Sequence, residues 1–513
     1  MEQRTDFLPL TLETPEAEAV SAENGTRTWR QLESNARRFA HALESLGLGI
    51  GDRWAFLSHN RVEWPELSLG NARAGTRFVP LNWHLTVPEL VYLLEDSGAD
   101  MLVVDPANEE KGRATAREVG IPSDRIFVLG EAFDAWLYTF PETNPRDDIA
   151  GAPLLYTGGT TGRSKGVIRS DSGGPVSFWR EAANLWASAI YMPERGVGLI
   201  TTPLYHAFGA GILGSFLARR HRIVLKTRFE LPDFLQTIGR EKITSTALVP
   251  TLIIRLAKIP PEEWNQYDLS SLKWICHTAA PCPAWAKQTL INRLGPIIVE
   301  FLGSSEGTGP VVCTSEEWIS HPGTIGRPNP RLEASVVDDE GNDLPLGSVG
   351  TLYFRRVDGP PVYHGDPDKT DQSRLPDGRF TVGDVGWMDA EGFIYLADRR
   401  VDLILSGGVN IYPAEVEAVL LEHPRVRDAA VFGIPDPEFG EQVKAAVQLQ
   451  DGVTSDEETA DTIIQWCRTR LASFKCPKSI DFHETLPREE SGKLKKRFLR
   501  EVYWNNQTPT SAE

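Results

Sequence analysis

The sequence predicts an α/β protein in which a large N-terminal body of stacked α/β layers is followed by a small α+β lid domain. Three observations predict this class. The 513 residues exceed the size of one ordinary domain, helical and strand-like segments alternate through most of the chain, and the pattern changes near residue 400. We therefore expect two domains, residues 1–399 and residues 400–513.

The alternation starts with a capping box from Thr28 to Gln31, which begins a helix with apolar residues at helical spacing. Gly47 and Gly49 end this helix. Another helix is predicted over 88–94, with Thr86 as its N-cap. The alternation favours largely parallel sheets, with buried strands expected at 54–57, 102–104 and 126–129.

Beyond residue 400 the pattern predicts a separate small domain. Pro413 begins a helix there, because proline is tolerated in the first turn, and Val416, Val419 and Leu420 form its apolar stripe. The other expected elements are strands at 429–432 and 443–449, a helix over 463–471 and a basic segment at 493–500. Together they suffice for an α+β domain of about 110 residues.

Charge and cysteine content exclude several classes of function. With 53 basic and 71 acidic side chains the net charge is −18, so we expect no binding to nucleic acid, and local donors must hold any anionic ligand. Five cysteines without CxxC spacing predict a reduced, cytoplasmic protein. The N-terminus does not resemble a signal peptide, and no run of 18 apolar residues predicts a membrane span.

The strongest local signal for chemistry is the glycine-rich segment from Tyr156 to Gly166. Apolar residues precede it, as at the end of a strand, and its glycines let the backbone approach a ligand closely. Exposed N–H groups, threonine hydroxyls and the Lys165 ammonium suit phosphate oxygens. The segment does not fit the Walker A pattern, and alone it is also consistent with a flexible surface loop.

The segment from Thr157 to Gly166 resembles the phosphate loop of the adenylate-forming superfamily, which includes acyl-CoA synthetases, peptide-synthetase adenylation domains and beetle luciferases. Other segments resemble further motifs of this family, in the same order along the chain, and the ordered set is far more specific than any one motif. They are an aromatic-His element at 203–206, an adenine-side turn at 277–281, a segment at 302–306, a ribose-contacting pair at 383–384 and 398–399, an SGGxNIxPxExE segment at 406–417 and a catalytic-lysine loop at 487–493.

The resemblance implies ATP-dependent activation of a carboxylic acid. Attack of the carboxylate on the α-phosphate gives an acyl-adenylate and pyrophosphate, and because two anions meet, the site must neutralise charge. By resemblance, Lys493 stabilises that charge and Glu306 holds Mg²⁺. Asp384 accepts hydrogen bonds from the ribose, with support from Arg399. The other nucleotide contacts implied are Thr157, Gly158, Gly159, Thr160, Thr161, Gly162, Lys165, Ala279, Ala280, Leu302, Gly303 and Ser305.

Taken singly, these residues have plainer interpretations. Glu306 is consistent with a solvated side chain, Asp384 with the cap of a turn, and Lys493 with the start of a solvated helix. His277 is consistent with a core histidine, and we leave it without a role. Departures from the family pattern also occur, and they bear on the hinge and on nucleotide packing: Val401 for Asp or Lys, Gly158 for Ser, Ser164 for Pro and Leu302 for an aromatic residue.

The nature of the acid follows partly from the same resemblance. Amino-acid-activating relatives have an Asp near the position of His206, which we count among the catalytic residues, so we do not expect a free α-amino acid. Phe208 and the small residues around it predict an apolar acid, cyclic or aromatic, and a medium-chain fatty acid fits as well. The residues expected to contact the acid are Phe208, Gly209, Gly211, Thr251 and Gly303.

The acyl acceptor is indicated by two glycines. Gly407 and Gly408 resemble the residues that line a pantetheine tunnel, because a backbone without Cβ lets a slim thiol chain pass, although a tight turn alone explains them too. We therefore favour an acid–CoA ligase that uses ATP, Mg²⁺ and CoA. Two alternatives stay open: an ATP-dependent amide synthetase in which an amine takes the acyl group, and a non-catalytic nucleotide-binding relative. The oligomeric state is not readable from the sequence.

Overall fold

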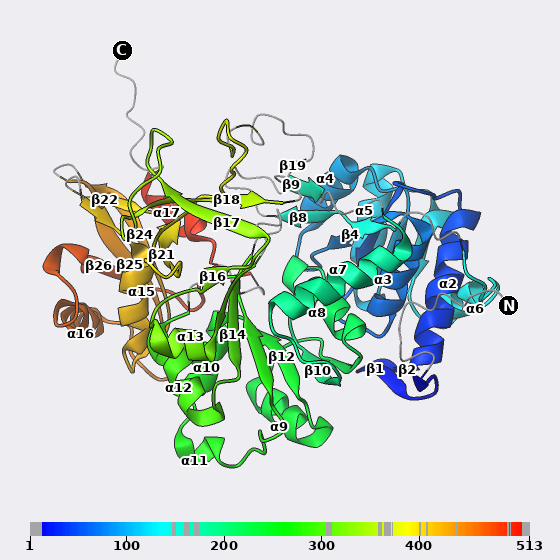
Figure 1. The fold of residues 1–513 in the computed structure, drawn as a ribbon, viewed down its shortest axis with the longest axis horizontal. Coiled ribbons are helices and arrows are strands. Elements are labelled where there is room, and N and C mark those ends of the chain that lie inside the picture. Colours follow the sequence, from blue (N-terminus) through cyan, green and yellow to red (C-terminus); the bar gives the residue numbers. More distant parts are fainter. Residues whose placement is uncertain are drawn as a thin grey trace.

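The computed structural model describes residues 13–145, 150–157, 165–168, 174–280, 282–303, 310–357, 362–363, 371, 373–399, 402–406, 409–436, 439–489, 492 and 494–504. Within this part of the chain, a large N-terminal body lies beside a smaller C-terminal domain, drawn in orange and red in Figure 1. This mixed α/β architecture confirms the predicted fold class.

The centre of the N-terminal body is a sheet with the strand order β16-β15-β14-β13-β12-β10-β11-β1-β2 among the described residues. The strands from β14 to β1 in this order are parallel, whereas β15, β16 and β2 add antiparallel edges. Their bounds are β1 (Glu18–Ala22), β2 (Gly25–Thr28), β10 (Gly196–Ile200), β11 (His221–Leu225), β12 (Ser245–Leu248), β13 (Trp274–His277), β14 (Ile298–Leu302), β15 (Val311–Thr314) and β16 (Arg327–Pro328).

A second, parallel sheet has the order β6-β5-β3-β4-β7, and helices separate it from the central sheet. Helices α2, α3, α7 and α8 share one apolar core with both sheets, α4 and α5 cover the outer face of the second sheet, and α9, α10 and α12 cover the outer face of the central one. These are the stacked layers that the alternation predicts. The bounds are β3 (Arg53–Leu57), β4 (Arg77–Leu81), β5 (Leu102–Val104), β6 (Ile126–Val128), β7 (Ala152–Pro153), α2 (Trp29–Ser45), α3 (Glu63–Ala74), α4 (Val87–Ser97), α5 (Glu109–Val119), α7 (Val176–Ala189), α8 (Ala207–Ala218), α9 (Leu231–Glu241), α10 (Pro250–Ala257) and α12 (Ala284–Leu294).

The first helix shows why the local sequence forms these elements. The Gln31 amide donates to Thr28 Oγ1 over 3.2 Å, and the Thr28 amide donates to Gln31 Oε1 over 2.9 Å, so the predicted capping box is formed. The same reciprocal arrangement joins Thr86 and Glu89 at the start of α4. The strands expected at 54–57, 102–104 and 126–129 are confirmed as β3, β5 and β6.

Two antiparallel sheets complete the body. One has the order β17-β18-β20-β21, and the other joins β8, β9 and β19. Their bounds are β8 (Leu155–Thr157), β9 (Lys165–Ile168), β17 (Leu332–Val337), β18 (Gly350–Arg356), β19 (Val362–Tyr363), β20 (Asp384–Met388) and β21 (Ile394–Arg399). The other described helices of the body are α6 (Glu131–Leu137), α11 (Pro261–Trp264) and α13 (Ser315–Ser320).

The C-terminal domain is built on a sheet of order β23-β22-β25-β24, with β26 parallel to β25. Helix α15 begins at Pro413 as predicted, and Val416 and Leu420 are fully buried. The helix predicted over 463–471 is α16, which starts earlier because Asp456 caps it by accepting from the Thr459 amide over 2.8 Å, and it ends earlier, at Arg468. The bounds are β22 (Ile404–Ser406), β23 (Val409–Ile411), β24 (Val426–Asp436), β25 (Gly440–Leu449), β26 (Ser479–Phe482), α15 (Pro413–Glu422), α16 (Glu457–Arg468) and α17 (Lys496–Trp504).

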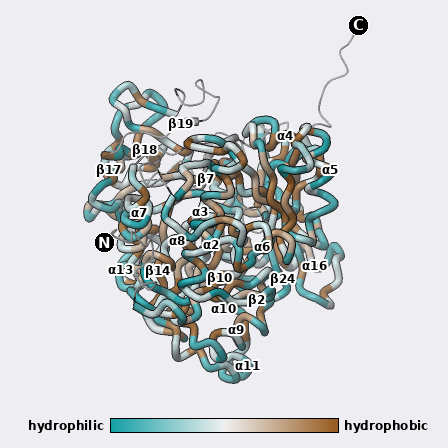
Figure 2. The backbone as a smooth tube through the Cα atoms, turned by 90° about the vertical axis from the view of Figure 1, so that its right-hand side faces the viewer, coloured by the Kyte–Doolittle hydropathy of each residue, from teal (hydrophilic) through white to brown (hydrophobic). Residues whose placement is uncertain are grey.

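Hydrophobic segments gather inside these layers, while outer loops and helix turns are hydrophilic (Figure 2). No helix in the described ranges is long and apolar enough to cross a membrane. All five cysteines are free thiols in the structure.

Candidate active site

The carboxyl ends of parallel strands β10, β12, β13 and β14 meet at one edge of the central sheet, where open α/β sheets bind their ligands. Residues predicted for the site stand at or directly after each of these ends. They are His206, Phe208, Gly209 and Gly211 after β10, Thr251 after β12, Ala279 and Ala280 after β13, and Leu302 and Gly303 at the end of β14. The topology therefore brings together the residues predicted to contact adenine and the acid.

The segment that leads to His206 is held by a buried amide from the other sheet. Asn60 donates to the Thr202 carbonyl over 2.9 Å and to the Lys226 carbonyl over 3.0 Å. Its side-chain oxygen accepts from the Leu204 amide over 2.9 Å. The sequence analysis missed Asn60, because its partners lie more than a hundred residues away in the chain and no motif marks it.

The adenine-side turn has a restricted backbone. Ala279 has φ 82°, a conformation that residues other than glycine rarely adopt and that the surrounding structure must determine. His277, at the end of β13, is fully buried, and burial lowers its pKa to about 4, so the ring is neutral at pH 7. The adenine-side turn therefore starts from a buried, neutral histidine and holds an unusual backbone conformation at Ala279.

Three aromatic rings form a cluster beside Gly303: Trp186 from α7, Phe208 from α8 and Phe301 from β14. The Phe301 ring centroid lies 5.3 Å from that of Trp186 and 5.8 Å from that of Phe208, both edge to face. A Cβ added to Gly303 would lie 3.2 Å from the Phe301 ring, so the glycine backbone lies directly against the cluster. Trp186 was not predicted, because an aromatic residue on a helix is not distinguishable from a core residue by its spacing.

The two glycines predicted to contact the acid have different surroundings. A Cβ on Gly209 would lie 2.3 Å from the Pro203 carbonyl oxygen, so this glycine lets the start of α8 pack closely on the preceding segment. A Cβ on Gly211 would meet no atom within 4 Å, and Gly211 is exposed. Gly209 therefore has a packing role that the sequence did not indicate, and its contact with the acid stays a prediction.

Asp384 and Arg399, the predicted ribose pair, stand directly opposite each other in the antiparallel pair of β20 and β21. Opposed residues of such a pair have Cβ atoms about 5 Å apart. Asp384 is buried, with 5% of its surface exposed. The sheet therefore brings this carboxylate and the backbone of the predicted arginine together.

The glycine-rich segment is framed by an antiparallel pair in which Thr157 opposes Lys165, as expected for a loop between two strands. Several predicted residues lie outside the described residues: Gly158, Gly159, Thr160, Thr161, Gly162, Ser305, Glu306, Gly407, Gly408 and Lys493. Their roles stay predictions, as do those of the Thr157, Lys165 and Arg399 side chains.

The loop that carries Lys493 is tied to the C-terminal sheet by Arg488. Its guanidinium donates to both carboxylate oxygens of Asp428 on β24, over 2.6 and 2.8 Å, and to the Gly492 carbonyl over 2.7 Å. A bidentate pair of this kind has a defined geometry. Arg488 therefore holds the backbone next to the predicted catalytic lysine, a role that sequence reasoning missed.

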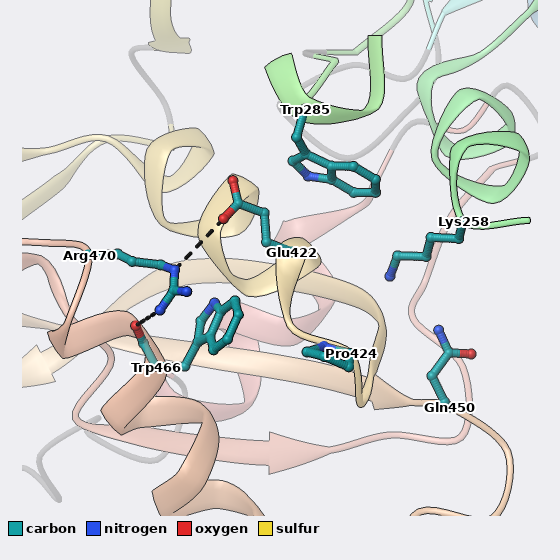
Figure 3. Close-up of a pocket in the computed structure, with 7 residues that line it drawn as sticks. All are labelled: Lys258, Trp285, Glu422, Pro424, Gln450, Trp466 and Arg470. Atoms are coloured by element: carbon teal, nitrogen blue, oxygen red, sulfur yellow. Dashed lines mark hydrogen bonds and ion pairs between the residues drawn. The ribbon is translucent and has the colours of Figure 1, made fainter. Parts of the chain in front are cut away.

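The same loop contacts the strand-end edge of the N-terminal body. A Cβ on Gly492 would lie 3.1 Å from Val249 Cγ2 and 3.3 Å from Thr251 Oγ1, so the glycine backbone packs directly on the segment after β12. A second contact between the domains is the hydrogen bond from Lys258 Nζ to the Val426 carbonyl, 2.7 Å long. A cavity of about 690 Å³ lies beside it, lined from both domains by residues that include Trp285, Trp466 and Arg470 (Figure 3).

A family model described as "AMP-binding enzyme" matches residues 11–364, and one described as "AMP-binding enzyme C-terminal domain" matches residues 415–493. The chain belongs to the AMP-binding enzymes. The first match covers most of the N-terminal body, and the second covers most of the C-terminal domain that carries Arg488 and Gly492.

Individual relatives align with this AMP-binding enzyme over nearly its whole length. A feruloyl-CoA synthase of an Amycolatopsis species is 34% identical over 496 residues, which cover 95% of this chain and 96% of the relative. The fatty acid–[acyl-carrier-protein] ligase ScoC of Streptomyces coeruleorubidus is 32% identical, with coverage of 96% and 94%. Among solved structures, the amide bond synthetase McbA of Marinactinospora thermotolerans is 28% identical with a TM-score of 0.81, covering 97% of this chain and 99% of its own.

These comparisons confirm the family predicted from the ordered motifs. The AMP-binding enzyme falls in the acid–CoA ligase branch of the adenylate-forming superfamily. The predicted class of activity, AMP-forming acid–CoA ligation, is confirmed with it.

Proposed function

We propose that this AMP-binding enzyme activates a hydrophobic aromatic acid with ATP and Mg²⁺ and transfers the acyl group to CoA. The contact of Gly492 with Val249 and Thr251 carries the proposal. It brings the backbone next to Lys493 to the edge where the adenine-side turn and the aromatic cluster meet. This arrangement suits adenylate formation, because the lysine charge is needed where carboxylate and α-phosphate react.

The roles of the other residues follow from their positions. Asp384 would accept hydrogen bonds from the ribose, since its carboxylate lies opposite Arg399 on neighbouring strands. The turn of Ala279 and Ala280 and the end of β14 would form the two sides of the adenine slot. The described residues form no group of three or more His, Cys, Asp or Glu able to hold a metal. By resemblance to the family, Glu306 would hold Mg²⁺ together with phosphate oxygens of ATP, because hard oxygen ligands suit this ion.

The aromatic cluster supports the choice of acid. The inclined rings around Gly303 form an apolar aromatic surface, against which an aryl group can add a further edge-to-face or stacked contact that a flexible chain cannot make. The relative that is a feruloyl-CoA synthase acts, by its name, on an aromatic acid. The amide bond synthetase keeps an amine acceptor as a second candidate.

Two further proposals concern the domain boundary and the location of the protein in the cell. We propose a domain boundary between residues 399 and 400, which is supported by the change of sheet between the end of β21 at Arg399 and the start of β22 at Ile404. The cytoplasmic location is retained as a proposal, supported by five free thiols, and cell fractionation tests it.

Trapping with hydroxylamine tests the function. The enzyme is incubated with ATP, Mg²⁺ and ferulate, anthranilate or octanoate, and each hydroxamate is measured. We expect the aromatic acids to react faster than octanoate, and the reverse order contradicts the proposed acid. Mass spectrometry with CoA, an amine and an acyl carrier protein in competition then identifies the acceptor. An amide or carrier-protein product without acyl-CoA contradicts the proposed transfer.

A further inference from the structure

A buried ion pair lies directly behind the adenine-side turn. Lys287 Nζ on α12 is 2.6 Å from Glu300 Oε2 on β14, and the two residues are 1% and 7% exposed. Burial disfavours both charges, but their attraction outweighs it, which raises the pKa of Lys287 and lowers that of Glu300. Both groups therefore stay charged at neutral pH, in a place where apolar residues would be easier to bury.

The pair brackets the turn from both sides. Glu300 stands beside His277 in the parallel pair of β13 and β14, and His277 Nε2 lies 3.8 Å from Glu300 Oε2. His277 is the last residue before the turn, and Lys287 lies in the first part of the helix that follows it. One carboxylate on β14 therefore lies close to a residue before the turn, His277, and to a residue after it, Lys287.

The same strand also reaches the opposite side of the slot. Glu300 and Leu302 are two residues apart on β14, so they share a face of the sheet, while Phe301 between them points to the aromatic cluster. Neither ring nitrogen of His277 has a hydrogen-bond partner among the described residues, so the histidine adds packing rather than a further tie. The ion pair of Lys287 with Glu300 is the contact that joins the adenine-side turn and α12 to β14.

We infer that Lys287 and Glu300 are positioning residues that set the separation of the two sides of the adenine slot. Residues 278–280 hold a strained backbone at Ala279, and such a conformation persists only where neighbouring structure determines it. Loss of the Lys287–Glu300 ion pair lets the adenine-side turn relax away from Leu302, which weakens nucleotide binding. The inference rests on the proposed use of this edge for ATP.

The test replaces the pair as a unit. Lys287→Met/Glu300→Leu removes both charges without leaving one unpaired, and equilibrium binding of ATP is measured by calorimetry. We expect Kd for ATP to rise about tenfold, because small misplacements of a binding wall weaken it strongly. Lys287→Gln/Glu300→Gln replaces the ion pair with a hydrogen bond between two neutral side chains, and it should restore most of the affinity for ATP.

The matched control is the equally buried pair of Arg73 and Glu33, 2.8 Å apart between α3 and α2. Arg73→Met/Glu33→Leu should leave Kd for ATP within about twofold of the wild type. An unchanged Kd in the Lys287/Glu300 variant, or an equal rise in the control, overturns the inference. If the apolar variant does not fold, Glu300→Gln decides in the same way, and an unchanged Kd overturns it.

Activity measurements separate this inference from the proposed function. A wild-type enzyme that binds ATP but forms no hydroxamate with any acid contradicts the proposed function and leaves the comparison of Kd values intact. With an acid that reacts, KM for ATP should rise in the Lys287/Glu300 variant while KM for the acid stays within about twofold. An equal rise in both KM values indicates a general structural defect and overturns the inference.

Discussion

The two walls of the active site are held in different ways. The N-terminal wall consists of segments that follow parallel strands, and buried residues such as Asn60, Lys287 and Glu300 support it from behind. The C-terminal wall is the loop around Gly492, which Arg488 ties to its own domain and which touches the N-terminal wall through a glycine. From this difference we expect the N-terminal wall to stay fixed and serve both half-reactions, and the C-terminal wall to detach and serve adenylation alone.

The largest effect should come from the detachable wall. Lys493→Ala removes the charge that stabilises the reacting phosphate, so adenylate formation should fall by about 10²–10³-fold. Thioester formation from a supplied acyl-adenylate should stay within about threefold of the wild type. Pyrophosphate release and acyl-CoA formation measure the two steps, and an equal loss in both contradicts the distinction between the walls.

A smaller effect on the same wall is expected for Arg488→Met. This variant removes the hydrogen bond to the Gly492 carbonyl and the bidentate pair with Asp428, so adenylation should fall about thirtyfold without a matching loss of thioester formation. Arg427→Met is the control, because Arg427 pairs with Asp451 at the surface, and it should change neither step. Equal losses of adenylation in Arg488→Met and Arg427→Met would show that the contacts of Arg488 with Gly492 and Asp428 have no specific role in adenylation.

The fixed wall should behave differently. Phe208→Ala removes one ring of the aromatic cluster, so kcat/KM for an aromatic acid should fall about tenfold, with less effect on octanoate. Both half-reactions should be slowed to a similar extent, because the acyl group stays against this wall throughout. Steady-state kinetics with both acids check this. If Phe208→Ala slowed adenylation alone, the N-terminal wall would behave like the C-terminal wall, which contradicts the distinction between them.

The contact between the domains should have a modest effect. Lys258→Met removes the hydrogen bond to the Val426 carbonyl, and the loss of one such bond corresponds to about threefold in adenylation. Lys242→Met, which removes an exposed pair with Asp268 in the N-terminal body, is the control and should change nothing. A change of more than tenfold in Lys258→Met would make this hydrogen bond a major part of docking.

The support behind the fixed wall should be sensitive to acid. His277 has a pKa of about 4 in the fold, below its ordinary value of about 6.5, so the unfolded chain takes up a proton first and stability is lost as pH falls from 6.5 to 4. At pH 5.5 this amounts to about 1 kcal/mol. Denaturant unfolding should show a shallower pH dependence for His277→Gln, and an unchanged slope contradicts the assignment; His221, whose pKa burial also lowers to about 4, keeps part of the slope.

Sequence reasoning predicted local elements and ordered motifs well, because their signals lie within a few residues. The capping box at Thr28 and the helix at Pro413 are of this kind. Asp384 and Arg399 were predicted as a ribose-contacting pair, and the structure adds that they stand opposite each other on β20 and β21. Sequence reasoning missed Asn60, whose partner Thr202 lies 142 residues away, and Lys258, whose partner Val426 lies 168 residues away. Hydrogen bonds to distant backbone carbonyls leave no pattern in one sequence.

The site was predicted as a set of residues with Lys493 on a mobile C-terminal domain, but the contacts that hold its two walls in place were not predicted. Arg488 lies inside the motif from which Lys493 was recognised, yet its bond to Asp428 depends on how the loop folds back on β24. Gly209 was expected beside the acid, whereas close packing on Pro203 explains why it lacks a Cβ. Spacing indicates which residues are grouped, and only tertiary packing shows what each of them supports.

The glycine at position 492 has a consequence for turnover. Its φ of 79° disfavours a side chain, and an added Cβ would lie only 3.1 Å from Val249 Cγ2 and 3.3 Å from Thr251 Oγ1, so this part of the docked surface is glycine backbone rather than an interlocking side chain. A smooth contact of this kind separates without rotamer changes or a trapped intermediate, so leaving it adds little to the activation barrier. We expect the C-terminal loop to undock once in every catalytic cycle, and a contact of this kind would then both align the loop and release it quickly.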